Sequence, residues 1–135
     1  MQKVILGTML FILIATACKK NSQTTVRHPI QGLWVGTYSN NIDTFFFSLS
    51  IYDDYIQNVS YEQHAANYAI NFGYGGWTTE GNKFIFSGHP DTGTFIYNTL
   101  WGSAIYDSIK RTLTNGILRD SLTGNSYIWS MNKVN

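Results

Sequence analysis

The feature that most constrains the fold of this chain is an alternation of large apolar and smaller or polar side chains. Within residues 43–52, Phe45, Phe47, Leu49 and Ile51 share one face if the segment is extended. Successive side chains of a β-strand point to opposite faces, so this alternation predicts a half-buried strand. The same period recurs in residues 67–72, 83–87, 94–98 and 127–131.

Short runs rich in Gly, Asn, Asp and Pro separate these segments. Such residues favour turns because they tolerate or fix the backbone angles that turns need. We expect turns at residues 39–41, 53–54, 73–76, 80–82, 88–91, 114–116 and 123–125. Their spacing predicts eight to ten strands. Residues 62–66 are the best helical candidate, and they would form one turn at most.

A series of antiparallel strands in about 105 residues can close into an up-and-down barrel or stack as a β-sandwich. Aromatic residues make up 16% of the chain and charged residues 13%, a balance that favours strands and argues against disorder. We expect an all-β, antiparallel up-and-down β-barrel of about eight strands, with a β-sandwich as the alternative. A barrel of this size holds its own side chains or one small ligand.

The N-terminal segment, MQKVILGTMLFILIATAC, has Lys3 near its start and an apolar stretch from Val4 to Ala17. The stretch is shorter than the roughly 20 residues that span a bilayer as a helix, but it suits a secretory signal. Its end, Ala15-Thr16-Ala17-Cys18, resembles the lipobox of bacterial lipoproteins. The resemblance implies cleavage before Cys18 and attachment of lipid to its sulfur. A plain signal peptide and a single-pass anchor are the alternatives.

These features predict a signal peptide at residues 1–17, a polar tether at 18–29 and a β-barrel domain at 30–135. Cys18 is the only cysteine, so no intramolecular disulfide is possible. A net charge of +1 leaves no electrostatic footprint for nucleic acid. The membrane, reached through the lipid on Cys18, is the expected partner. Because no acidic run follows Cys18, we expect the outer membrane of a Gram-negative bacterium, on its periplasmic face.

Three segments resemble small bacterial lipocalin-like lipoproteins. Residues 30–38, with Gly32-Leu33-Trp34, resemble the opening strand of these barrels, residues 76–84 look like a recurring hairpin, and residues 129–133 resemble the final strand. The resemblance implies a barrel in which Gly32, Trp34 and Trp129 are structural and Trp34 is buried near a closed end. It implies ligand binding only loosely.

Metal and catalytic sites are not expected. His28, His64 and His89 lack the spacing of metal ligands. The Asp53-Asp54 pair could serve acid–base chemistry with Glu62, but adjacent strand residues point to opposite faces, so a hairpin turn is the better interpretation. Residues 73–76 are glycine-rich without a following helix, which favours a hinge or bulge in a strand over a phosphate site. No cofactor is expected.

The aromatic residues leave two interpretations open, a filled core and a cavity for an apolar or aromatic ligand. Alternation predicts that the inward set is Phe45, Phe47, Tyr68, Phe72, Phe84, Phe86, Tyr97 and Trp129. Gly73, Gly75 and Gly76 remove side chains near Trp77, so we expect any ligand to enter beside Trp77 and to contact aromatic faces. The candidate ligand-binding residues are therefore Trp77 and this inward set without Trp129.

The sequence thus predicts a non-enzymatic, lipid-anchored envelope protein whose barrel binds a small apolar ligand or an envelope protein. The alternative is a periplasmic enzyme inhibitor or protein-interaction lipoprotein that acts through surface loops. The interior distinguishes the two, because a continuous cavity of about 300 Å³ or more favours the ligand and a filled interior favours the loops.

Overall fold

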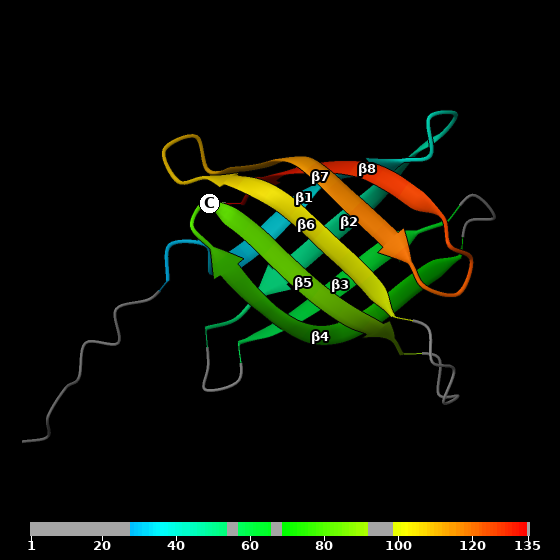
Figure 1. Cartoon of the computed structure of the whole chain (residues 1–135), viewed down its shortest axis with the longest axis horizontal. Helices are drawn as coiled ribbons and strands as arrows, with labels where there is room; N and C mark the ends of the chain where they lie inside the picture. The colour runs from blue at the N-terminus through cyan, green and yellow to red at the C-terminus, as the bar shows by residue number, and fades with distance from the viewer. Residues whose placement is uncertain (1–27, 54–56, 66–68, 92–98, 135) are drawn as a thin grey trace, which may run out of the picture.

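The computed structural model describes residues 28–53, 57–65, 69–91 and 99–134, and they form a closed antiparallel barrel (Figure 1). Its strands are β1 (Gly32–Ser39), β2 (Thr44–Ile51), β3 (Asn58–His64), β4 (Ile70–Glu80), β5 (Lys83–Pro90), β6 (Leu100–Asp107), β7 (Thr112–Asp120) and β8 (Ser126–Lys133). Each strand pairs with the next, and β8 pairs with β1. The predicted all-β up-and-down barrel is confirmed, and the sandwich alternative is wrong.

Side-chain alternation accounts for the strands that the sequence predicted best. In β2, Phe47, Leu49 and Ile51 point into the barrel and are buried. In β5, Phe84 and Phe86 also point into the barrel and are buried. Lys83, the first residue of this strand, is exposed. Burial of these apolar faces, at roughly 25 cal/mol per Å², is the main driving force that holds the sheet closed.

Three of the predicted turns are wrong. Residues 73–76 lie within β4, whose pairing with β3 and β5 continues through them without a register shift. Residues 88–90 still belong to β5. Residues 114–116 lie within β7 at a β-bulge, where Asn115 has a φ of 52° and the register with β8 shifts between Leu113 and Gly116. A bulge needs the same permissive residues as a turn, so local sequence does not separate the two.

The turn between β6 and β7 was not predicted. Oδ1 of Asp107 accepts hydrogen bonds from the backbone N–H groups of Ile109 and Lys110, at 3.0 Å and 2.9 Å. Asp and Asn commonly form such an Asx-type turn, because their short side chains can accept hydrogen bonds from nearby backbone N–H groups. The possible helical turn at residues 62–66 is also wrong where it is described, because Glu62 and His64 belong to β3.

The barrel has two different ends. At one end, which we call the plugged end, residues 28–31 fold across the barrel before β1 begins, and the β2–β3, β4–β5 and β6–β7 connections lie there too (Figure 1). The opposite end, the loop end, carries the other connections, among them residues 40–43 and 121–125. The described residues contain no helix long and apolar enough to cross a membrane.

Candidate functional site

The predicted ligand-binding residues do not all lie in one place. Four of them are buried in the barrel interior: Phe47, Trp77, Phe84 and Phe86. Phe45 is half-buried and packs against this core. Phe72 lies on the outside with 55% of its surface exposed, so its predicted inward position is wrong. Tyr68 and Tyr97 lie outside the described residues.

Aromatic rings fill the middle of the barrel. The ring centroid of Phe47 lies 6.3 Å from that of Phe86 and 5.9 Å from that of Trp129. These rings occupy the space beside two inward glycines: a Cβ at Gly102 would lie 1.9 Å from the Phe86 ring, and one at Gly116 would lie 2.4 Å from the Trp129 ring. An interior packed in this way admits a ligand only if a ring moves.

Gly73 of β4 lies against another ring and does not open a mouth. A Cβ at Gly73 would lie 2.3 Å from the Tyr61 ring, and one at Gly88 on β5 would lie 2.7 Å from it. Tyr61 is buried, and this burial, assisted by the nearby Asp120 carboxylate, raises the pKa of its phenol to about 12. The expectation that Gly73 makes an opening is therefore wrong.

The plugged end covers the place where a ligand was expected to enter. The His28 ring lies edge-on to Trp77, with 5.4 Å between the ring centroids. Nε1–H of Trp77 donates to the carbonyl oxygen of Tyr52 at 2.6 Å, and Nε1–H of Trp34 donates to that of Ile30 at 2.7 Å. Both indoles are buried with their polar atoms satisfied, so Trp77 is a closing residue and not an entrance.

Lys133, at the end of β8, fastens the plug. Its Nζ donates to the carbonyl oxygen of Pro29 at 2.7 Å and lies 5.8 Å from the centroid of the Trp34 ring. Partial burial, with Arg111 nearby, lowers the pKa of Lys133. Gly32 makes room for this arrangement, because a Cβ there would lie 2.9 Å from Cε of Lys133, and its φ of +134° also disfavours any other residue.

The interior near the loop end is richer in tyrosine. The Tyr38 hydroxyl donates to the carbonyl oxygen of His64 at 2.6 Å, and its ring lies 5.3 Å from Phe45 and 5.4 Å from Tyr127. Burial is the main cause that raises the pKa of Tyr38. One interior donor is left over: Nε1–H of Trp129 is buried without a hydrogen-bond partner among the described residues, which costs about 1–3 kcal/mol.

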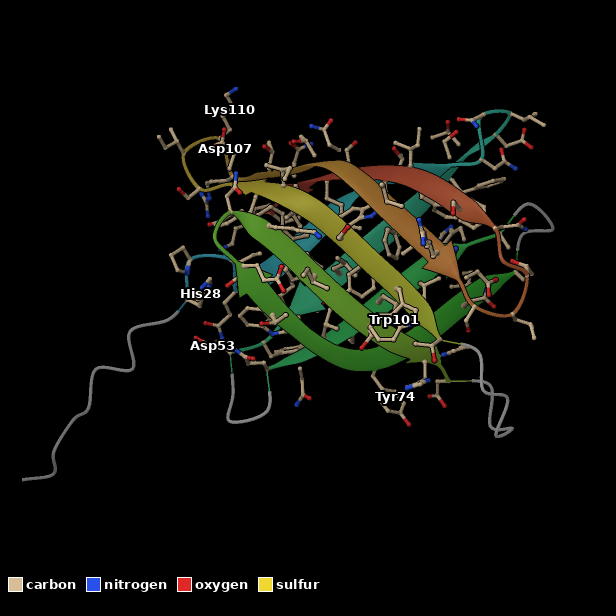
Figure 2. The ribbon with its side chains drawn as sticks, viewed as in Figure 1. His28, Asp53, Tyr74, Trp101, Asp107 and Lys110 are labelled. Carbon is tan, nitrogen blue, oxygen red and sulfur yellow. The ribbon has the colours of Figure 1, made fainter. Side chains whose placement is uncertain are left out.

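Several hollows lined by described residues open on the outer surface of the barrel. Three adjoin one another: one of about 570 Å³ lies between the plug and the nearby ends of β1, β2 and β8, and those of about 400 and 300 Å³ lie over β1–β4. Around them stand three aromatic side chains that are 48–64% exposed, namely Tyr52, Phe72 and Tyr74. Figure 2 shows Tyr74 projecting away from the barrel. We call the three hollows together the outer groove.

A second apolar patch lies on another side of the barrel. Trp101 of β6 and Ile117 of β7 are about half exposed and line a hollow of about 260 Å³ with Lys83 and Arg119. Trp101 lies on β6, two strands from Tyr74 of β4, and β5 separates them. This hollow is smaller than the usual ligand site of 300–1,000 Å³, so the outer groove is the better candidate.

The described titratable residues that the sequence singled out contact one another at most in pairs. The backbone N–H of His28 donates to Oδ2 of Asp53 at 2.9 Å, Nε2 of His64 lies 2.7 Å from Oε1 of Glu62, and Nδ1 of His89 lies 3.4 Å from the Thr99 hydroxyl. In the part of the chain that the structure describes, no three His, Cys, Asp or Glu side chains gather as metal ligands would. Cys18 and Asp54 lie outside the described residues.

The outer groove was not predicted, although the side-chain alternation in the sequence contains an indication of it. The alternation that points Phe47, Leu49 and Ile51 inward also points Ser48 and Ser50 outward. Small outward residues on neighbouring strands leave a hollow, but only the strand register shows which of them become neighbours.

The fold and site define a small, closed up-and-down barrel with a filled core and a groove on its outer surface. No protein-family model, curated protein or solved structure matches the chain.

Proposed function

We propose that this protein is a lipid-anchored, non-enzymatic binding protein of the bacterial cell envelope, with a lipocalin-like barrel that binds on its outside. The observation that carries the proposal is the contrast between the two surfaces of the sheet. Contacting rings fill the inner surface, whereas the outer surface of β1–β4 keeps a groove with three exposed aromatic side chains. Concave surfaces with aromatic side chains and a few polar groups are where proteins bind ligands.

The anchor is the second part of the proposal. The leader and its lipobox-like end support cleavage before Cys18 and a diacylglyceryl group on its sulfur, in the outer membrane facing the periplasm. Several acyl chains, each contributing about 0.8 kcal/mol per buried CH₂, would hold the protein stably on the bilayer.

Cys18→Ala tests the anchor. Cells that express the wild type and are fed a fatty-acid analogue should yield a labelled protein in the membrane fraction. The Cys18→Ala protein should be unlabelled and soluble, because its only sulfur for acylation is gone. Labelling of both proteins to the same extent would contradict the anchor and leave the barrel's binding role to be judged separately.

A second candidate is an interaction protein that docks on an envelope enzyme through its loops. Two apolar side chains at the tips of the loop end favour it, since Ile42 is 87% exposed and Leu122 is 66% exposed. Scattered exposed apolar residues are common on soluble proteins, however, and a groove is the stronger indication of binding.

A further inference from the structure

The outer groove has a polar floor between aromatic and aliphatic walls, and the strand register explains why. One row across the outer face pairs Leu33 with Ser50, Ser50 with Ser60, and Ser60 with Tyr74. Two small serines on β2 and β3 therefore lie between larger side chains on β1 and β4. Neighbouring strands are about 4.8 Å apart, so the walls stand roughly 14 Å from each other.

The next row along the barrel repeats this arrangement. It runs from Val35 through Ser48 and Glu62 to Phe72. Phe72 and Tyr74 are two residues apart on β4 and thus stand on the same face, about 7 Å from each other along the strand. They form a continuous aromatic wall, and Tyr52 stands at the end of β2 nearest the plug.

The three hollows form one groove because they share lining residues. Leu33 and Ser50 line both the 570 Å³ and the 300 Å³ hollows. Tyr52 joins the 570 Å³ hollow to the 400 Å³ hollow, and Ser60 joins the 400 Å³ hollow to the 300 Å³ hollow. The groove thus runs over β1–β4 with hydroxyl groups along its floor.

Ser48 marks the groove as a place that offers hydrogen bonds to a ligand. The residue is 9% exposed, points outward between two inward neighbours, and lines the 300 Å³ hollow. A hydroxyl group both donates and accepts hydrogen bonds, so a ligand in this hollow can form one with Ser48.

The charges along the groove and the pairing of the strands limit which class of ligand the groove can bind. Among the residues that the structure describes, Lys133 is the only lysine or arginine that lines the groove, and it already donates to Pro29, while Glu62 lies at the other end. The groove therefore offers little positive charge to neutralise a polyanion. Each described strand is paired on both sides, so no sheet edge offers main-chain hydrogen bonds to an extended peptide. A purely apolar chain would cover the serine hydroxyls without pairing them.

We propose that the outer groove binds a neutral oligosaccharide, an inference that rests on the proposed binding function. A pyranose ring presents C–H groups on one face, which suit the negative face of an aromatic ring, and Phe72 and Tyr74 offer such faces. Its hydroxyls both donate and accept, as do the hydroxyls of Ser48, Ser50 and Ser60, and the Glu62 carboxylate accepts further bonds. The groove therefore matches both the apolar and the polar parts of a sugar.

Calorimetric titration of the lipidated full-length protein tests the proposal. The protein is kept in an amine-oxide detergent, because sugar-headed detergents would compete, and cellotetraose and chitotetraose serve as ligands against an empty-micelle blank. At least one of the two should bind saturably. Tyr74→Ala and Phe72→Ala should each weaken that binding about tenfold, as expected when one stacking face is lost. Trp101→Ala, which removes a similarly exposed ring that does not line the groove, should leave it unchanged.

The other outcomes distinguish a failure of the sugar class from a failure of the proposed binding function. If neither sugar binds but the uncharged apolar probe N-phenyl-1-naphthylamine binds and Tyr74→Ala abolishes it, the sugar class is overturned and the binding function stands. Sugar binding that Trp101→Ala weakens and Tyr74→Ala does not would overturn the groove as the site. No saturable binding of any of the three compounds would overturn both the groove and the proposed binding function.

Discussion

Single glycines decide how closely the strands of this barrel approach one another, and two adjacent ones in β4 make opposite demands. A Cβ at Gly75 would lie 1.8 Å from the backbone oxygen of Ser87 and 2.6 Å from Cα of Gly88. A Cβ at Gly76 would have no neighbour nearer than 4.0 Å. The first position thus requires glycine for a close approach of backbone to backbone, and the second does not.

We therefore expect Gly75→Ala to destabilise the protein by about 3 kcal/mol or more, because backbone cannot give way as a side chain can. Gly76→Ala should be neutral or stabilise by up to about 1 kcal/mol, since alanine restricts the unfolded chain. Urea unfolding followed by tryptophan fluorescence measures both. Equal losses of stability for the two variants would mean that the close approach at Gly75 does not exist.

Among the elements, the plug at residues 28–31 contributes to the core although it is not a strand. Ile30 has no exposed surface and belongs to the hydrophobic core, although it precedes the first strand. Its carbonyl oxygen accepts from Trp34, and the carbonyl of Pro29 accepts from Lys133. The plug is therefore part of the barrel's core and not an appendage of the tether.

Ile30→Ala should accordingly cost about 2–5 kcal/mol, the range for truncating a buried isoleucine. Ile42→Ala is the matched control, because the same change at an 87% exposed side chain should stay within about 0.5 kcal/mol. Thermal unfolding by circular dichroism compares the two. A cost below about 1 kcal/mol at Ile30 would show that the plug does not seal this end in solution.

Elements with clear alternation were predictable from sequence, and β4 shows where that reasoning stops. Alternation separated the two faces of β2 and β5, because most of the large apolar side chains of each strand lie on one face. In β4 both Phe72 and Gly73 are plausible inward residues. The choice depends on Tyr61 of β3, whose ring fills the space beside Gly73. No local pattern carries that long-range contact, so Phe72 was assigned to the wrong face.

At the scale of the whole molecule, the same limit explains why the sequence did not predict the outer groove. Closure of the sheet sets how much volume the inward rings must fill, and closure is a property of all eight strands together. The sequence predicted the barrel and its aromatic core. Only the register of four strands determines which serines lie between Leu33 and Tyr74 and form the outer groove.

The position of the plug also sets how an anchored barrel would stand on its membrane. The described chain begins at His28 on the plugged end, and the 10 residues from Cys18 to His28 reach at most roughly 36 Å. If the lipid is on Cys18, the plugged end should on average lie nearer the bilayer than the loop end. Ile109, in the β6–β7 turn of the plugged end, is 92% exposed, and Ile42 at the loop end is 87% exposed.

Single cysteines at these two positions test the orientation, because the lipid would block the sulfur of Cys18 and leave only the new thiol for labelling. The lipidated Ile109→Cys and Ile42→Cys proteins are reconstituted in vesicles and labelled with one fluorophore. Quenching by spin-labelled lipid headgroups should be stronger at Ile109→Cys. The difference should vanish in the matching variants that also carry Cys18→Ala, since those proteins lack the anchor. Stronger quenching at Ile42→Cys would mean that the loop end faces the bilayer and the plugged end is free.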